Sequence, residues 1–194
     1  MRVLIHEGAQ GSVQGEVRAT ARDLDFDNLV QTWRPRLFRY ALALLRDPDA
    51  AETITQDCFL RAFDALDTFR GDCSIQTWLM HIAVNLVRDY SRNRRLQFWK
   101  RTKAASARPL ETYVAQGEAG QSPEKAAMLK QQLAAVWSNA DKLPNRQKTV
   151  FLLRFVEDMN ILEIAVATGM KEGTVKAQLF RALQKMRGAL RSQV

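Results

Sequence analysis

The chain has 194 residues, 46% of them hydrophobic, and it carries a net charge of +8 at neutral pH. This length accommodates one large domain or two small ones, each with its own core. No apolar run reaches the roughly 20 residues that span a bilayer, and the apolar patch at Val3–Ile5 is too short for the about 7 residues of a signal-peptide core. These features exclude a membrane-spanning protein, and we expect a cytoplasmic chain with no direct membrane insertion.

The chain lacks the residue groups that a metal site or an enzyme needs. Its only cysteines and histidines are Cys58, Cys73, His6 and His81, and they are not paired at the close spacings of a zinc site, which needs about four ligands. We find no paired carboxylates, no nucleophile with its base and no phosphate-binding glycine loop. The sequence therefore predicts no catalytic residue, no metal, no cofactor and no small-molecule substrate. Both thiols are expected to be ordinary reduced residues, with a thiol switch as the alternative.

The charges are segregated along the chain. Residues 88–103 contain seven basic side chains and one acid, residues 171–194 contain six and one, and residues 47–72 contain seven acids and two arginines. Two basic segments far apart, with an acidic segment before them, suggest two contacts with a polyanion and a separate protein contact. Solvated helix faces are the alternative explanation of this pattern.

Residues 1–24 are rich in Gly, Gln and Ala without a period, which predicts a disordered tail. Helical periodicity begins near Phe26 and stops at Asp47, which we expect to cap a second helix that has Pro48 in its first turn and runs to about Leu66. This second helix has a buried stripe that includes Cys58. Another of its faces carries Glu52, Gln56, Leu60 and Asp64. Leu60 is either an ordinary exposed leucine or the centre of a docking surface.

A polar loop over residues 67–74 precedes a third helical pattern that begins at Ile75. One stripe of this helix is apolar and includes Trp78, which we assign to the core. The opposite stripe becomes progressively basic and consists of Thr77, His81, Asn85, Arg88, Arg92 and Arg95. We expect this helix to complete a first domain over residues 25–100.

Residues 101–122 contain Pro109 and two glycines and show no sustained period, which predicts a flexible linker. A second domain is predicted over residues 123–194, with helices that begin at Ser122 and Pro144. No alternation typical of strands is present. The fold class is therefore predicted to be all-α, with two small helical domains joined by a flexible linker.

The sharpest motif lies between Asn160 and Leu190. Asn160 caps a short predicted helix, Gly169 ends it, and a second helix starts at Glu172, as in a helix-turn-helix. The outer face near the start of the second helix would enter the major groove, where Lys and Arg can contact phosphates or guanine. That face carries Lys176, Ala177, Phe180 and Arg181. Phe180 is either a contact to a thymine methyl group or a core residue.

Two blocks of sequence together resemble a known family. They are AAETITQDCFLRAFDALDTFRGDCSIQTWLMHIAVNLVRDYSRNRR and, after the linker, LPNRQKTVFLLRFVEDMNILEIAVATGMKEGTVKAQLFRALQKMR. The chain resembles the extracytoplasmic-function (ECF) sigma factors of the sigma-70 family from Phe26 to Leu190. The resemblance implies a non-enzymatic factor that binds core RNA polymerase and directs promoter recognition, DNA melting and transcription initiation. It also implies promoter DNA and an anti-sigma factor as partners.

The resemblance further implies roles for individual residues. The face around Leu60 would bind core polymerase through Glu52, Gln56, Asp57 and Leu60. The loop and the basic helix face would contact the −10 promoter element through Asp67, Phe69, Arg70, Asp72, Ser74, Asn85, Arg88, Arg92 and Arg95. The helix-turn-helix would read the −35 element through Lys176, Ala177, Phe180 and Arg181. Thr53 and Thr55 depart from the residues common in the family.

Two other functions remain as alternatives. A regulator that binds DNA as a dimer through the helix-turn-helix would select palindromic sites without polymerase. A recombinase with an appended helix-turn-helix would need a Ser or Tyr nucleophile in a basic catalytic cluster. Tyr40, Tyr90 and Tyr113 show no such setting, although Tyr90 lies near arginines in the sequence.

Overall fold

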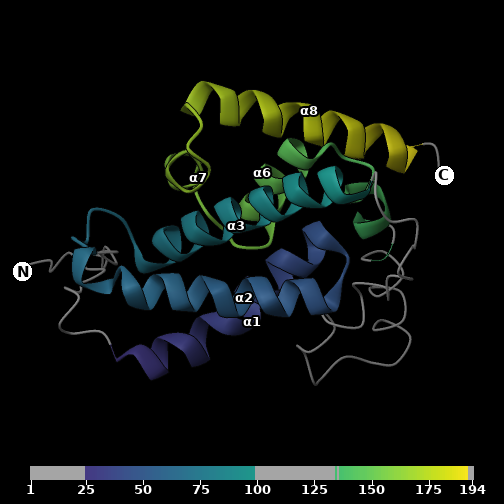
Figure 1. Ribbon diagram of the computed structural model, residues 1–194. Coiled ribbons are helices and arrows are strands. Elements are labelled where there is room, and N and C mark those ends of the chain that lie inside the picture. The colour runs from purple at the N-terminus through teal and green to yellow at the C-terminus, as the bar shows by residue number, and fades with distance from the viewer. Residues whose placement is uncertain (1–24, 99–133, 135, 192–194) are drawn as a thin grey trace, which may run out of the picture.

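The described part of the computed structural model, residues 25–98, 134 and 136–191, contains helices and no strand, which confirms the all-α class (Figure 1). The predicted tail, the linker and the helix start at Ser122 lie outside these residues. Residues 136–140 are helical. The remaining elements are α1 (Phe26–Leu45), α2 (Pro48–Asp64), the 3-10 helix η2 (Leu66–Thr68), α3 (Ile75–Phe98), α6 (Asn145–Phe155), α7 (Ile161–Thr168) and α8 (Glu172–Arg191).

Local capping defines the ends of α1 and α2. The Asp25 carboxylate accepts hydrogen bonds from the first-turn backbone of α1, and Arg46, with φ 55°, ends that helix in the left-handed conformation. Asp47 then caps α2 by accepting from the backbone N–H of Ala50 at 3.1 Å, with Pro48 as the first helical residue. The predicted cap is confirmed, although α2 ends at Asp64, because η2 replaces the expected last turn.

Helices α1, α2 and α3 pack together around the stripes that the periodicity identified. Ala51, Cys58 and Ala62 of α2 are fully buried, as is Leu79 of α3. The Cys58 thiol donates to the Leu79 carbonyl across 3.6 Å, so even the polar atom of this core residue has a partner. Small residues at these positions let the helix axes approach closely.

The helix-turn-helix forms as the sequence predicts. Asn160 and Glu163 make a reciprocal capping box at the start of α7, with 3.0 Å from the Glu163 N–H to Asn160 and 2.7 Å from the Asn160 N–H to Glu163. Gly169 ends α7 at φ 68°, a conformation that glycine adopts without strain. Val175 of α8 is fully buried against this unit.

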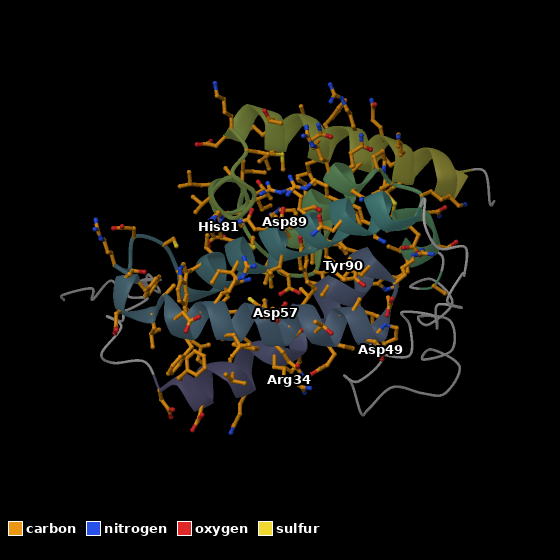
Figure 2. The ribbon with its side chains drawn as sticks, viewed as in Figure 1. Arg34, Asp49, Asp57, His81, Asp89 and Tyr90 are labelled. Atoms are coloured by element: carbon orange, nitrogen blue, oxygen red, sulfur yellow. The ribbon has the colours of Figure 1, made fainter. Side chains whose placement is uncertain are left out.

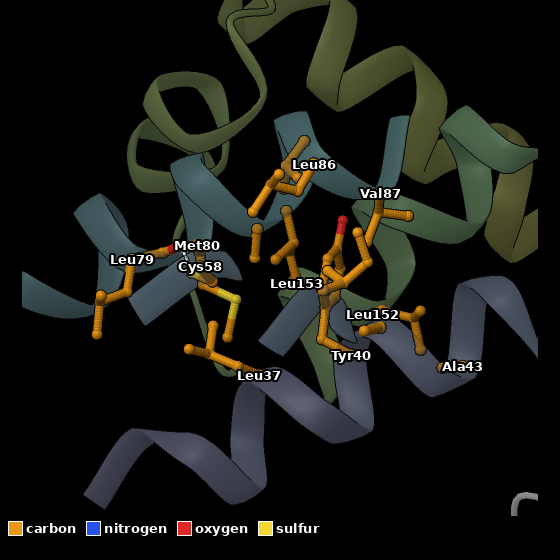
Figure 3. Packing of buried hydrophobic residues seen from close by; sticks show 14 of the residues in the cluster. Leu37, Tyr40, Ala43, Cys58, Leu79, Met80, Leu86, Val87, Leu152 and Leu153 are labelled. Carbon is orange, nitrogen blue, oxygen red and sulfur yellow. Dashed lines mark hydrogen bonds between the residues drawn. The ribbon is translucent and has the colours of Figure 1, made fainter. Parts of the chain in front are cut away.

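The two helical units pack against each other instead of lying apart. Leu152 and Leu153 of α6 belong to the same buried cluster as Tyr40 of α1 and Leu86 of α3 (Figure 3). In Figure 1, α7 and α8 lie over the side of α3 that faces away from α2. The sequence does not reveal this contact, because a residue that is buried against another domain has the same apolar character as one buried within its own.

We expect Leu79→Ala to lower the free energy of unfolding by about 2 to 5 kcal/mol, because it removes fully buried methyl groups and leaves a cavity. Leu60→Ala, at a side chain that is 63% exposed, is the matched control and should change it by less than about 0.5 kcal/mol. Urea unfolding followed by tryptophan fluorescence measures both changes. Equal changes in the free energy of unfolding for the two variants would contradict the burial of Leu79 on α3.

Candidate nucleic-acid interface

The outer face of α8 is open to solvent. Lys176 and Arg181 are exposed, Ala177 is half-buried, and Phe180 is 61% exposed. The interpretation of Phe180 as a core residue is therefore wrong. Val175 packs the start of α8 against α7, so these side chains stand on the second helix of a helix-turn-helix, the place of a recognition helix.

The basic face of α3 carries several of the predicted nucleic-acid contacts. The Arg88 guanidinium donates to the Asn85 side-chain oxygen at 2.7 Å, and Arg92 lies 3.5 Å from the Asp89 carboxylate. Both arginines are exposed, so their charges remain available to a phosphate. Arg95 lies on α3, but its side chain is outside the described residues.

The loop between η2 and α3 is held by its own side chains. The Phe69 ring packs on Trp78 with 4.8 Å between centroids, and Ser74 accepts from the Thr77 N–H at 3.2 Å. Gly71, at φ 71°, provides a turn that other residues rarely adopt. Trp78 is half-buried and packs against the core, as expected. The other predicted contacts of the loop are exposed, namely Asp67, Arg70 and Asp72.

A shallow apolar groove of about 470 Å³ runs between α1 and α2. Leu60 and Phe63 keep 63% and 61% of their surfaces exposed beside it. Glu52, Gln56 and Leu60 line this groove, whereas the half-buried Asp57 does not. Adjacent exposed apolar side chains with a polar rim are typical of a protein-docking surface.

A second, larger groove of about 900 Å³ lies between α3 and the helix-turn-helix unit. Arg88 and Arg92 line one side, and Thr174 and Gln178 of α8 line the other. Arg146 of α6 adds a third guanidinium that the sequence analysis missed. No local pattern marks Arg146, since it becomes part of a basic groove only through the packing of the two domains.

His81 connects the basic face of α3 to α7 (Figure 2). Its Nδ1 lies 3.2 Å from the carbonyl oxygens of both Val166 and Ala167, and its Nε2 lies 3.1 Å from the Asn85 amide nitrogen. Carbonyl oxygens only accept, so Nδ1 carries the proton and Nε2 accepts from Asn85. Asn85, a predicted −10 contact, is thereby linked through His81 to α7 of the second domain.

The two thiols have different environments. Burial raises the pKa of Cys58 to about 12, although the nearby Arg61 opposes this shift. Partial burial, followed by the negative charge of Asp72, raises the pKa of Cys73. Both thiols are thus kept in the protonated, less reactive form, and Cys58 the more strongly.

Both helical domains of the chain match known protein families. Residues 29–97 match the family described as Sigma-70 region 2, and residues 137–186 match Sigma-70, region 4. The ECF RNA polymerase sigma factor SigW of Bacillus subtilis is 26% identical over 86% of this chain and 89% of its own length. The RNA polymerase sigma-H factor of Pseudomonas aeruginosa is 30% identical over 85% of this chain and 86% of its own. The chain is an ECF sigma factor of the sigma-70 family.

Solved structures share the fold of this sigma factor. The sigma factor RpoE, in complex with the anti-sigma factor NepR from Bartonella quintana, has a TM-score of 0.67 at 20% identity, over 86% of this chain and 97% of that one. CnrH, in complex with the cytosolic domain of CnrY, has a TM-score of 0.61 at 23% identity, over 90% and 94%. Within the part of this sigma factor that the structure describes, no helix is long and apolar enough to cross a membrane.

We expect a maleimide at pH 8 to react with Cys73 in the folded sigma factor and with Cys58 only after unfolding. With a pKa of about 12, only about one Cys58 in ten thousand is a thiolate at this pH, and the side chain is also buried. Mass spectrometry of tryptic peptides measures both rates. Equally fast labelling of the two thiols under native conditions would contradict this burial.

Proposed function

We propose that this protein initiates transcription by binding core RNA polymerase through its first domain and reading the two promoter elements with different domains. The observation that carries the proposal is the presence of sigma-70 regions 2 and 4, in this order, in one chain. The described basic and apolar surfaces are consistent with that division of roles. The chain itself performs no chemistry in this proposal, and catalysis belongs to the polymerase in the cytoplasm.

The polymerase contact is assigned to the groove between α1 and α2. Leu60 and Phe63 provide an exposed apolar centre, and an exposed ion pair of 2.7 Å between Arg34 and Glu52 lies at its rim. An apolar centre with a polar rim is the usual arrangement of a protein interface. Gln56 donates to Glu52 at 3.2 Å and holds the carboxylate in place. Asp57 stays in the proposal as a peripheral contact.

The −10 contact is assigned to the loop before α3 and to the basic face of that helix. The loop offers the exposed polar side chains Asp67, Arg70 and Asp72 beside the aromatic pair formed by Phe69 and Trp78. Polar groups around an aromatic platform suit the capture of a base that has left the duplex, for which unstacking costs a few kcal/mol. Arg88 and Arg92 would hold the phosphates of the same strand.

The −35 contact is assigned to the start of α8. Lys176 and Arg181 can anchor phosphates or read guanine, and the exposed Phe180 can contact a thymine methyl group. Ala177, which is small and half-buried, lets the helix approach the bases closely. An anti-sigma factor is a further proposed partner, because the structural neighbour RpoE was solved in complex with the anti-sigma factor NepR.

Reconstitution with core RNA polymerase tests this function. We expect the purified chain to co-elute with core, and the reconstituted holoenzyme to select paired −35 and −10 elements at a fixed spacing from random DNA. If the chain ignored core and selected an inverted repeat alone, it would act as a dimeric regulator and the proposal would fail.

We expect Leu60→Ala to weaken core binding by about fivefold to tenfold, because it removes the exposed apolar centre of the docking surface. Gln31→Ala, on an exposed position of α1 that does not line the groove, is the control. Fluorescence anisotropy with labelled chain and core polymerase measures both affinities. An unchanged affinity for the Leu60 variant would place the docking surface elsewhere.

We expect Arg181→Ala to cost about 1 to 3 kcal/mol of promoter binding by the holoenzyme and to relax specificity at one position of the −35 element. Lys185→Ala, an exposed change one turn later on α8, should leave the preferred sequence unchanged. Binding to a library of single-base variants measures both effects. If the variant lost affinity for the promoter but kept the same base preference in the −35 element, Arg181 would contact phosphate and not a base.

A further inference from the structure

The groove between α3 and the helix-turn-helix unit has the size and the lining of a small-molecule site. Its volume of about 900 Å³ falls within the roughly 300 to 1,000 Å³ that is usual for such sites. Three of its lining residues are arginines, namely Arg88, Arg92 and Arg146. In the part of the chain that the structure describes, no acid lines the groove. A groove with three cations and no acid attracts anions.

The start of α6 adds backbone donors to the arginines. Pro144 occupies the cap position of this eleven-residue helix and makes no side-chain hydrogen bond, so the first N–H groups of α6 lack a capping side chain. Pro144, Asn145 and Arg146 all line the groove. Uncapped N–H groups at the start of a helix, beside a guanidinium, favour the binding of phosphate.

Tyr40 of α1 brings a buried hydroxyl to the floor of the same groove. The residue is 2% exposed, lines the groove and points its hydroxyl toward Val87 of α3 (Figure 3). This hydroxyl makes no hydrogen bond of good geometry. Burial raises its pKa, and the nearby Thr149 side chain partly opposes that shift. A buried donor that is poorly satisfied is unfavourable, so a polar ligand group at the floor would gain a hydrogen bond there.

The rest of the groove is suited to a ligand with an apolar body that has polar edges. Four apolar side chains line it, namely Leu44, Val84, Val87 and Met170. Hydroxyl and amide groups are also present, on Ser91, Asn145, Thr174 and Gln178. An apolar surface can hold the face of a nucleobase, and hydroxyl and amide groups can bond to the edge of the base or to a ribose. An inorganic anion would use only the arginines, and a hydrocarbon chain would use only the apolar side chains.

Polar contacts between the domains hold the walls of the groove in place. Glu157, in the turn between α6 and α7, has a side chain with no solvent exposure, and its carboxylate accepts from the Arg36 guanidinium at 2.9 Å. The carboxylate also lies 3.8 Å from Arg39, and both arginines belong to α1. The main-chain oxygen of Glu157 accepts from Gln76 of α3 at 2.6 Å. The turn that follows α6 is thereby fixed to two helices of the first domain.

The region just before α6 is held in a similar way. Arg46, at the end of α1, forms an ion pair with Asp141, whose carboxylate also accepts from Lys148 of α6 at 2.6 Å. The groove is therefore formed before a ligand arrives, and a ligand does not have to order its walls on binding.

We propose that this groove binds a nucleoside polyphosphate, with its phosphates on the three arginines and the start of α6 and its base against the apolar wall. The binding site itself does not depend on the promoter contacts proposed above. Its consequence does rest on them, because Arg88 and Arg92 are also assigned to the −10 strand. The nucleotide and the −10 strand would then compete for the same two guanidinium groups, and the nucleotide would lower the affinity for the strand.

The test measures binding of a fluorescent ATP analogue to the full-length chain by anisotropy, at one fixed salt concentration and in EDTA. Arg146→Ala is the informative variant, because Arg146 is exposed and is not among the proposed promoter contacts. Arg187→Ala is the matched control, since it removes the same charge from an exposed position of the same domain that does not line the groove. We expect Arg146→Ala to raise the Kd of the analogue by about tenfold and Arg187→Ala by less than about twofold.

Two further comparisons separate a nucleotide site from non-specific binding of an anion. Unlabelled ATP should displace the analogue at about a tenfold lower concentration than inorganic tripolyphosphate, which has the phosphates without the base and the ribose. Tyr40→Phe removes only the hydroxyl group and should raise the Kd by about threefold. The Tm of this variant without ligand should not fall, because the hydroxyl makes no good hydrogen bond in the unliganded protein.

Equal effects of the two arginine variants, or equal displacement by ATP and tripolyphosphate, would overturn the nucleotide site. An unchanged Kd for Tyr40→Phe would overturn the contact with the Tyr40 hydroxyl. If a single-stranded −10 oligonucleotide bound far more tightly than ATP and lost its affinity in Arg146→Ala, the groove would hold the DNA strand instead of a nucleotide. If ATP bound as expected but the oligonucleotide did not displace it, the −10 assignment of Arg88 and Arg92 would be wrong, whereas the nucleotide site would stand.

Discussion

The side chain of Glu157 is inaccessible to water, and the charges that compensate it belong to the other domain. This places a constraint on the whole chain, because a carboxylate can be buried here only while α1 lies against the turn between α6 and α7. Leu152 lies beside Tyr40 in the same interface between the domains. The Glu157 carboxylate is therefore buried when the two domains pack together, and it becomes exposed when they separate.

The interface that results combines two kinds of interaction. Leu152 and Leu153 continue the core of the first domain, and the hydrophobic effect favours closure without selecting one orientation. The ion pairs and the hydrogen bonds of Gln76 and His81 do select one, since they require particular atoms to meet. An interface that combines apolar and polar contacts is typical of two domains within one chain.

The sequence was sufficient for features that depend on neighbouring residues. The caps Asp47 and Asn160, the glycine that ends α7 and the buried stripe of α2 were all predicted, because each depends on spacing along one helix. The contact between domains was not predicted, since Glu157 and Asp141 look like ordinary surface acids until the partner helix is placed. Phe180 was left ambiguous because periodicity cannot separate an exposed aromatic residue from a buried one near the edge of a stripe.

The exposed outer face of α8 has a consequence for how a promoter is found. In the proposed function α8 is one of two DNA-reading elements, and a single element with few phosphate contacts dissociates quickly at physiological salt. Such a molecule samples many sequences and stays on none of them. Residence becomes long only when the second element joins the first on the same DNA, since a tethered second contact raises the effective local concentration. An isolated −35 sequence elsewhere in a genome offers only one of the two contacts. The protein therefore dissociates from it quickly.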